Sequence, residues 1–391
     1  MNDGNALEIA FRVGPFPKLS ETFVLDQIKG MIARGHSVRV VADEPGDVVA
    51  GDPALAWLNE LAGVDYVNFS RPILSRLWAR MPYRLRHARR RSLEHKMCAQ
   101  NDVVICNFGW FGESVVANAG EPRRAKVITI FHGADMSSTA LAAGALPYPN
   151  LFVKGDLLLP ISDFWRHRLL DAGAPSQRTL VHRMGVDLDA FAFRARDVEK
   201  AAPFRFISVC RFVEKKGMEY ALRAISALQA RGLGGELQFD IVGNGPLEAE
   251  LRALSKELGI DEAVHFLGER SHAEIADSLS EADAFVLPSV VAGNGDMEGI
   301  PVSLMEAMAS GLPVISTRHS GIPELIEDGV NGLLADERDV EGLADVMMRM
   351  MRGKTMRSQL AAAARETVAE RFNSRKLNDQ LSHFARALAS G

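Results

Sequence analysis

Short runs of β-branched and aromatic residues alternate with helical segments through most of this chain, and this alternation limits the folds open to it. The first run is LEIAFRV (Leu7–Val13), which the loop GPFPKL joins to the helical segment SETFVLDQIKGMIARG. Ser20 is suited to cap the start of that helix and Gly35 to end it. The runs HSVRVVA, DVVICNF, KVITIFHG and LLLPIS follow. Strands that alternate with helices in this way form mostly parallel sheets with helices on both faces.

A second, similar set of runs begins with FRFISVCRF and continues through LQFDIVGNG, AVHFLGE, AFVLPS and PVISTRHSG. The chain has 391 residues, too many for one ordinary core and about right for two α/β domains. We therefore predict an α/β protein of two Rossmann-like, doubly wound domains that face a central cleft. The predicted parts are an N-terminal domain (1–187), a linker (188–203), a second domain (204–371) and a C-terminal helix (372–391) that could pack back onto the first domain.

Composition excludes several classes of protein. The formal net charge is −5, so the whole molecule has no global attraction for nucleic acid. The three cysteines are widely spaced and odd in number, which disfavours a disulfide framework and fits a reducing compartment. The N-terminal residues lack a signal peptide's basic and apolar regions, and no apolar run is long enough to span a bilayer. We expect a cytoplasmic protein, with contact to a membrane surface left open.

Two glutamates stand out in the stretch DMEGIPVSLMEAMASGLPVIS (Asp296–Ser316). Pro301 sits where the first turn of a helix tolerates proline, and Gly311 sits where that helix would end. Glu298 is therefore expected in the loop before the helix, and Glu306 about one and a half turns into it.

These two carboxylates suit a ligand with hydroxyl groups. An ionised carboxylate only accepts hydrogen bonds, so one glutamate could hold a sugar ring and the other a ribose. The backbone N–H groups of Gly299 and Ile300 are left free for an anion between them. The alternative is that both glutamates cap and solubilise the helix start. That alternative does not explain Glu306, which falls on a small, apolar face where an unpaired charge costs free energy.

Cations follow the first strand of the second set. Arg211, Lys215 and Lys216 precede Gly217, at which a helix begins. Arginine can grip a phosphate through two parallel hydrogen bonds, lysine acts as a point charge, and a helix N-terminus also favours anions. The alternative is a charged loop that faces solvent.

The next strand ends in the glycine-containing loop 243–246, of sequence GNGP. Gly243 permits a close backbone approach, as in phosphate loops, but the spacing is not that of the dinucleotide fingerprint. A tight turn between strand and helix explains it equally well. No Walker sequence, zinc-type cluster or G-x-S-x-G elbow is present, which argues against nucleotide hydrolysis, zinc chemistry and serine esterase chemistry.

The segment EGIPVSLMEAMASGLPVISTRHSGIPELIEDGVNGLL resembles the E-x7-E signature of the family 4 retaining glycosyltransferases, which have the GT-B fold. FHGADM, ISDFWRHRLLDAG, HRMGVDLDAF, SVCRFVEKKGMEYALRA and IVGNGPLEAEL fall in that family's order. FPKLSETF and GNGDMEGIPVS are most similar to bacterial exopolysaccharide-assembly transferases, such as those for colanic-acid-type polymers. The resemblance implies a transferase that takes a hexose from a nucleoside-diphosphate sugar, as a substrate rather than a cofactor.

The resemblance also implies roles for residues of the donor site. Arg211 and Lys216 would hold the diphosphate of the donor and stabilise the leaving nucleoside diphosphate. Glu298 would hold hydroxyls of the transferred sugar, with the N–H groups of Gly299 and Ile300 nearby. These implied roles make Glu298, Arg211 and Lys216 candidate catalytic residues.

Further implied roles lie at the two ends of the donor. Glu306 would hold the ribose hydroxyls, and the base would lie near backbone groups of Leu267 and Gly268. His132, in FHGAD, would face the donor sugar from across the cleft, as a further candidate catalytic residue; a core histidine satisfied by backbone groups is the alternative. Gly14 is expected in the first loop, where family members bring acceptor and phosphate together. The family often has two glycines there, whereas this chain has one followed by proline, which puts a phosphate role in doubt.

We predict a metal-independent reaction, because the cations and a helix terminus could replace a divalent ion at the diphosphate. Retention would follow from attack on the face that the phosphate leaves, with the departing phosphate taking the acceptor's proton. Glu298 as a covalent nucleophile is the competing mechanism. A nucleotide-sugar epimerase on the same fold and a non-catalytic sugar-nucleotide-binding protein are the competing functions; a phosphorylase would need a much longer chain.

A basic stretch points to the acceptor. Residues 71–96 hold nine arginines and lysines against a single acid, Glu94, with apolar residues interleaved. Such segments lie on anionic membrane surfaces, which favours a lipid-linked oligosaccharide acceptor at the cytoplasmic face of the inner membrane. A solvated surface helix and a nucleic-acid contact are the alternatives.

Overall fold

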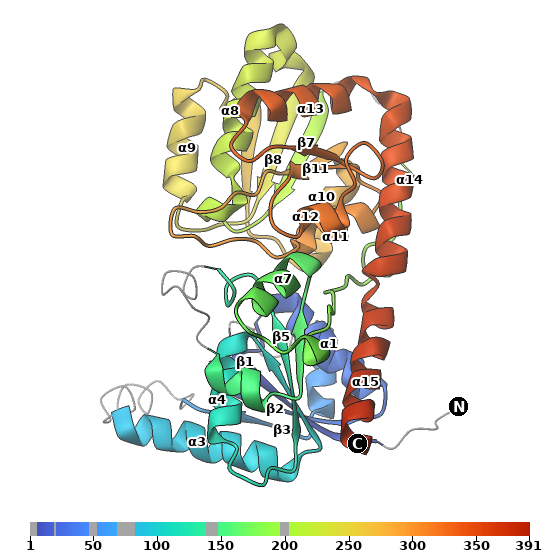
Figure 1. Cartoon of the computed structure of the whole chain (residues 1–391). Coiled ribbons are helices and arrows are strands. Elements are labelled where there is room, and N and C mark those ends of the chain that lie inside the picture. The colour runs from blue at the N-terminus through green and yellow to red at the C-terminus, as the bar shows by residue number, and fades with distance from the viewer. Residues whose placement is uncertain (1–5, 19–20, 47–52, 69–82, 138–147, 196–202) are drawn as a thin grey trace. The chain divides into compact units, whose positions relative to one another are not determined.

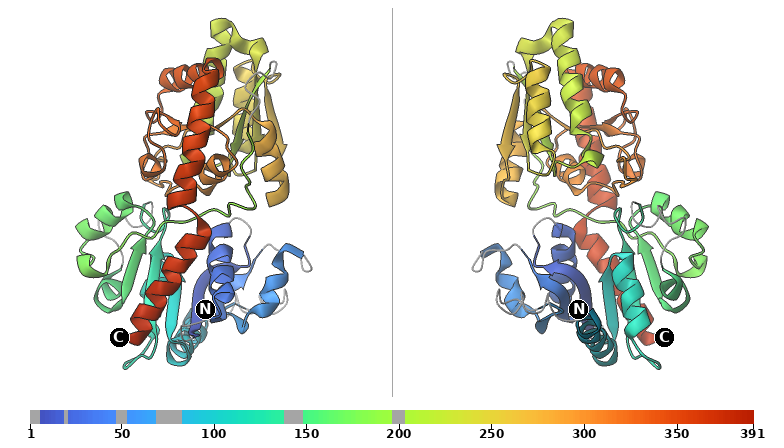
Figure 2. Two further views of the ribbon diagram at one scale, coloured as in Figure 1. Left: turned by 90° about the vertical axis from the view of Figure 1, so that its right-hand side faces the viewer. Right: turned by 90° about the vertical axis from the view of Figure 1, so that its left-hand side faces the viewer.

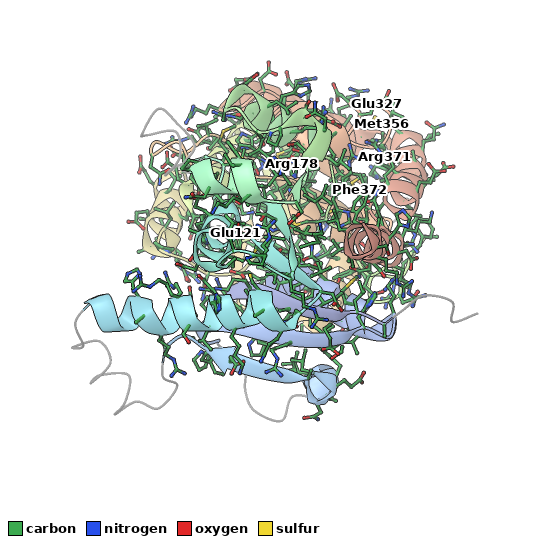
Figure 3. All side chains as sticks on the ribbon, turned by 60° about the horizontal axis from the view of Figure 1, so that its bottom comes forward. Glu121, Arg178, Glu327, Met356, Arg371 and Phe372 are labelled. Atoms are coloured by element: carbon green, nitrogen blue, oxygen red, sulfur yellow. The ribbon has the colours of Figure 1, made fainter. Side chains whose placement is uncertain are left out.

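The chain forms two compact units. The computed structural model describes residues 6–18, 21–46, 53–68, 83–137, 148–195 and 203–391 (Figure 1). Unit 1 is Met1–Arg183 with Ser374–Gly391, and unit 2 is Met184–Asn373. Unit 2 begins before the first residue of the predicted linker (188–203), and Phe191 of that linker is buried in the core of this unit. The N–H of Val186 also donates to the carbonyl oxygen of Phe372, at 2.8 Å; Figure 3 labels Phe372.

Unit 1 is built on a parallel six-stranded sheet of order β3-β2-β1-β4-β5-β6. Its elements are β1 (Glu8–Phe16), α1 (Thr22–Ala33), β2 (Ser37–Pro45), η2 (Pro53–Glu60), β3 (Gly63–Tyr66), α3 (Tyr83–Gln100), β4 (Val103–Asn107), α4 (Gly109–Asn118), β5 (Lys126–Phe131), α6 (Pro149–Lys154), β6 (Leu157–Pro160), α7 (Asp163–Asp171), η3 (Ser176–Arg178) and α15 (Ser374–Ser390). Every residue of β4 and β6 is buried, as expected for parallel strands covered on both faces. This strand order is that of the Rossmann fold.

Helix α15 belongs to unit 1 although it ends the chain, and it lies beside α1 (Figure 2). The Nδ2 of Asn378 donates to the carbonyl oxygen of Asp26, at 3.2 Å. The ring Nε2 of His36 lies 2.8 Å from the hydroxyl of Ser382. Because His36 is buried, its pKa falls to about 4, so the ring is neutral at pH 7. Buried polar contacts therefore hold the C-terminal helix on the first unit.

Unit 2 repeats the same order in a second parallel sheet, β12-β11-β10-β7-β8-β9. Its elements are β7 (Phe204–Val209), η4 (Glu214–Lys216), α8 (Met218–Leu228), η5 (Gln229–Leu233), η6 (Gly234–Glu236), β8 (Leu237–Val242), α9 (Glu248–Glu257), β9 (Val264–Gly268), α10 (His272–Glu281), β10 (Ala284–Leu287), α11 (Val302–Ala309), β11 (Val314–Thr317), α12 (Ile322–Leu325), β12 (Leu333–Ala335), α13 (Val340–Arg352) and α14 (Lys354–Arg371). The two sheets confirm the predicted fold class of two doubly wound, Rossmann-like units.

The basic stretch is only partly within the described residues, because 71–82 lie outside them. Its single acid, Glu94, is fully buried in α3 and pairs with the guanidinium of Arg12, with Oε1 and Nε 3.0 Å apart. The other oxygen of Glu94 accepts hydrogen bonds from Ser114 (2.8 Å) and Asn118 (2.7 Å). A buried ion pair with its remaining lone pairs satisfied fixes α3 against β1 and α4.

Two of the arginines in α3 turn toward their own unit. The Nη2 of Arg89 donates to the carbonyl oxygen of Tyr66, at 3.0 Å. Arg90 lies 3.5 Å from the carboxylate of Asp43. Arg91, by contrast, is exposed. Among the described helices, none combines the length and the apolar character that crossing a bilayer requires.

Candidate functional site

The strand order of unit 2 determines where its candidate ligand site lies. β7 and β10 are neighbours in the sheet, and from them the chain proceeds in opposite directions across it, through β8 and β9 on one side and β11 and β12 on the other. The loops after these two strands therefore meet at the switch point of the sheet, where ligands of doubly wound sheets bind. The loop after β7 carries Arg211 and Lys216, and the loop after β10 carries Glu298.

Lys216 and Glu298 form a close ion pair at this point. The Nζ of Lys216 lies 3.0 Å from Oε1 of Glu298, and the Nζ of Lys215 lies 3.7 Å from the same oxygen. Glu298 is only 7% exposed. Burial alone would raise its pKa, but the two ammonium charges outweigh burial and hold the pKa below its ordinary value. Glu298 is therefore an ionised acceptor at neutral pH.

The backbone of Glu298 is held by residues that follow β11. Its N–H donates to Nε2 of His319, at 3.0 Å, so that nitrogen carries no proton. The proton of the neutral ring is then on Nδ1, which donates to Glu337 at 2.6 Å. The hydroxyl of Ser320 donates to the carbonyl oxygen of Glu298, at 2.7 Å. His319 was not predicted, although its position just after a strand, in TRHSG, was a usable signal.

The loops that carry Lys216 and Glu298 also hold donors without partners. Within the part of the chain that the structure describes, the N–H groups of Gly299 and Ile300 have no acceptor, and both residues are buried. A buried N–H without a partner costs free energy, so an anionic or polar ligand would stabilise this loop. Arg211 is exposed, and its guanidinium has no ion-pair partner among the described residues. The site thus offers cations, free amides and one ionised carboxylate.

Glu306 lies on the buried side of α11 and is 7% exposed. Its Oε1 is 3.2 Å from Nε2 of His272, the first residue of α10. The buried carboxylate of Glu306 therefore has the ring of His272 as its partner. The centroid of that ring lies 4.8 Å from the centroid of the Phe191 ring.

The predicted residues Gly243, Leu267 and Gly268 lie at the carboxyl ends of β8 and β9, at this same edge of the sheet. The N–H of Gly243 donates to the carbonyl oxygen of Gly268, at 2.8 Å. Gly268 directly follows Leu267 in the sequence. Gly243 has a φ of 128°, and a Cβ there would overlap the backbone carbonyl of Cys210. In this structure the close backbone approach of Gly243 is therefore to the neighbouring loop after β7.

Gly14 and His132 belong to unit 1. Gly14 was expected in a loop after a strand ending at Val13, and this was wrong, because β1 continues to Phe16. β4 pairs with β1 only as far as Arg12, so beyond that residue one edge of β1 is open. Proline occurs in sheets mainly where a strand has an open edge, and Pro15 lies in this part of β1.

His132 follows β5 and is 5% exposed. Its Nε2 lies 3.0 Å from Oδ1 of Asn107, which only accepts, so the proton is on Nε2. Burial lowers the pKa of His132 to about 3, so the ring is neutral. Its Nδ1 is buried and has no hydrogen-bond partner among the described residues. The contact with Asn107 is to a side chain, whereas the core-histidine alternative supposed backbone partners.

The prediction of a metal-free reaction also assumed that the chain has no Asp-x-Asp metal motif, and this assumption was wrong, because Asp187-Leu188-Asp189 is such a sequence. Oδ1 of Asp187 accepts hydrogen bonds from the N–H groups of Asp189 (2.9 Å) and Ala190 (3.4 Å), so it caps a turn. Among the described residues, no group of three or more His, Cys, Asp or Glu side chains is arranged to hold a metal ion.

Two Rossmann-like units, with cations and unbonded amides at the switch point of the second, are the architecture of the GT-B class of glycosyltransferases. The group 1 glycosyl transferase model matches residues 190–367, and the Glycosyltransferase Family 4 model matches residues 20–190. An amylovoran biosynthesis glycosyltransferase, AmsK of Erwinia amylovora, is 36% identical over 98% of this chain and 100% of its own length. A putative colanic acid biosynthesis glycosyltransferase, WcaL of Salmonella typhimurium, is 38% identical over 96% of this chain and 98% of its own.

Solved structures share the fold. Anabaena Alr3699/HepE in complex with UDP has a TM-score of 0.75 at 20% identity, with 97% of this chain and 100% of that one covered. Sucrose-phosphate synthase of Thermosynechococcus elongatus has a TM-score of 0.76 at 19% identity, with 98% and 99% covered. The two family models and the full-length relatives at 36–38% identity show that the chain belongs to the family 4 glycosyltransferases, and the resemblance inferred from the E-x7-E segment is confirmed.

Proposed function

We propose that this enzyme is a retaining, metal-independent glycosyltransferase that moves a hexose from a nucleoside-diphosphate sugar to a lipid-linked glycan during exopolysaccharide assembly. The observation that carries the proposal is the ionised Glu298 beside Lys216, next to the free N–H groups of Gly299 and Ile300. The exopolysaccharide context is supported by the full-length relatives named for amylovoran and colanic acid biosynthesis.

The chemistry follows from the charges at the switch point of unit 2. Arg211, Lys216 and the two free amides would bind the diphosphate and stabilise the charge that develops when the bond from the sugar carbon to the phosphate oxygen breaks. Glu298, as an ionised acceptor, would hold hydroxyls of the transferred sugar and fix its orientation. The leaving phosphate oxygen would take the proton of the attacking acceptor hydroxyl on the same face, which retains the configuration.

The donor is identified by a screen of UDP-glucose, UDP-galactose, GDP-mannose and GDP-fucose for release of free nucleoside diphosphate, with and without a bacterial glycolipid extract. We expect one donor to be consumed, faster with the extract, at a rate that EDTA changes less than about twofold because no divalent ion is needed. NMR of the product should show the anomeric configuration of the donor. Isomerised nucleotide sugar formed without extract would indicate an epimerase, and no turnover of any donor would contradict the proposal.

The proposed contact with anionic lipid needs a variant that spares the fold. Arg89 and Arg90 hold α3 to its own unit, so reversing their charges would disturb unit 1. Arg91 and Lys96 are exposed. We expect the Arg91→Glu, Lys96→Glu double variant to bind phosphatidylglycerol vesicles at least about thirtyfold more weakly, since it loses two basic residues that each contribute about 1 kcal/mol near such a surface.

Co-sedimentation measures this binding, and reversal of the same number of charges in unit 2, by Arg223→Glu together with Arg252→Glu, serves as the charge-matched control. Unchanged binding of the double variant, or equal loss in the control, would refute a membrane role for α3.

A further inference from the structure

We propose that Phe108 and Trp110 form an aromatic platform in unit 1 on which a pyranose ring of the glycan acceptor stacks. This inference rests on the proposed function and extends it to the acceptor. The platform is the pair of parallel rings directly after β4, with centroids 4.8 Å apart and planes 6° apart.

The sheet of unit 1 places this platform at its own switch point. β1 and β4 are neighbours, and the chain proceeds from β1 to β2 and β3 on one side and from β4 to β5 and β6 on the other. Phe108 is the first residue after β4, and α4 begins at Gly109. Ligands of open parallel sheets bind outside the carboxyl ends of the strands at this point. The platform therefore stands where unit 1 is expected to take a ligand.

Trp110 is exposed where a large aromatic side chain is normally covered. It is 41% exposed, whereas Trp165 of the same unit is fully buried. One side of the indole is against Phe108, and the edge contact with Phe111 has a centroid distance of 6.1 Å. A rigid, half-open indole offers a large apolar area at a low entropy cost. The C–H face of a pyranose is a flat apolar surface of matching size, so stacking removes both from water.

The backbone under the platform is strained and held rigid. Phe108 has φ 81° and ψ 139°, a region that non-glycine residues rarely adopt and that persists mainly at functional sites. The carboxylate of Asp135 accepts hydrogen bonds from the N–H of Gly109 (2.7 Å) and of His132 (2.8 Å). It thereby ties the loop after β4 to the loop after β5. A preorganised platform loses little entropy when it binds a ligand.

A polar atom beside the platform lacks a partner. The ring of His132 lies 4.7 Å from the ring of Phe108, and its buried Nδ1 has no hydrogen-bond partner among the described residues. Because the proton of this neutral ring is on Nε2, Nδ1 is an acceptor. A sugar hydroxyl is a donor that would satisfy it. An apolar ring beside an unsatisfied acceptor favours a carbohydrate over a purely apolar ligand.

The charges nearby favour a neutral sugar over a phosphate. The guanidinium of Arg12 lies 4.3 Å from the centroid of Phe111, but Arg12 is fully buried and pairs with Glu94 and Asp43. Its charge is therefore already neutralised within the unit. The cations and amides that we assign to the diphosphate are those of unit 2, which leaves the platform of unit 1 for the acceptor.

The test compares Trp110→Ala and Trp110→Phe with Leu180→Ala, which removes an equally exposed apolar side chain of the same unit. Saturation-transfer NMR measures binding of methyl glucoside, galactoside and mannoside without any donor. We expect Trp110→Ala to weaken the bound glycoside about tenfold, Trp110→Phe less, and Leu180→Ala not at all. With the donor from the screen, acceptor KM should rise by the same factor while the donor Kd is unchanged.

The two readouts separate the two proposals. Glycoside binding that depends on Trp110 without turnover of any donor would support the platform and refute the proposed reaction. Turnover with an acceptor KM within twofold of wild type in Trp110→Ala would refute the platform alone, as would glycoside binding that does not depend on Trp110 or is absent. A loss of vesicle binding in Trp110→Ala, with acceptor KM unchanged, would show that the indole contacts lipid instead.

Discussion

Lys216→Ala is expected to lower kcat by about a hundredfold to a thousandfold in a protein that stays folded, the usual loss when one preorganised group facing developing charge is removed. In the structure Lys216 is the nearer of two ammonium groups to Glu298, at 3.0 Å. The variant would lose a cation for the leaving diphosphate and would also leave a buried carboxylate with only Lys215, at 3.7 Å, to stabilise its charge. Steady-state kinetics with the donor from the screen measures the effect.

The loss of Lys216 should also shift the pH dependence of the rate in a predictable direction. In the wild type, the lysines hold the pKa of Glu298 below its ordinary value against the opposing effect of burial. Without Lys216, burial is less opposed and the pKa rises, so Glu298 takes up a proton at a higher pH. The acid limb of the rate profile should therefore move to higher pH in Lys216→Ala. In Glu298→Gln, which has no such proton, the rate should be low at every pH.

Two control variants test whether the loss of rate is specific to Lys216. Lys215→Ala should cost less, because Lys215 shares its charge with Asp296, at 3.0 Å. Arg223→Ala, in an exposed pair on α8, should leave the rate unchanged. If Lys216→Ala keeps its rate within threefold of wild type with an unmoved acid limb, Lys216 does not act on the donor as proposed.

Gly217→Ala is expected to destabilise unit 2 by about 2 to 5 kcal/mol, the sum of a left-handed backbone and overpacking. Gly217 directly precedes α8 and has a φ of 65°, and a Cβ there would overlap the carbonyl oxygen of Pro288. That contact presses the loop after β7 against the loop after β10, so the same change should displace Lys216 from Glu298 and lower activity.

Gly232→Ala is the matched control, because its φ is 86° and a Cβ would meet nothing within 4 Å. It should cost only about 1 to 2 kcal/mol, for the backbone alone. Far-UV circular dichroism in urea follows both units. Tryptophan fluorescence follows unit 1 alone, since all four tryptophans precede residue 184. Equal losses in both variants would show that the contact with Pro288 is not tight.

The fold could be predicted because buried parallel strands leave continuous apolar runs, and these runs became strands in both sheets. The residues at which strands end were harder to predict from the sequence. β1 continues through Pro15, since it has lost its β4 neighbour by then, and no local residue signals this. β3 has only four half-buried residues, so it has no apolar run to detect.

The candidate site was predictable in its residue types but not in its pairings. Glu298 lacks a basic residue within its own segment, and its partner Lys216 follows a strand far away in the sequence. His319 and Trp110 were not predicted, because their importance depends on the order of strands in each sheet. That order brings together loops that lie far apart in the sequence. Spacing alone also could not show that Arg89 faces its own unit.

The most direct test of the central claim is calorimetric titration of the donor, and of its nucleoside diphosphate, into wild type, Lys216→Ala and Arg223→Ala. The account predicts that both ligands bind the wild type, that both bind Lys216→Ala at least about tenfold more weakly, a loss of about 1.4 kcal/mol, and that Arg223→Ala is unchanged. Wild-type protein that binds neither ligand, or equal affinity in all three proteins, would contradict it.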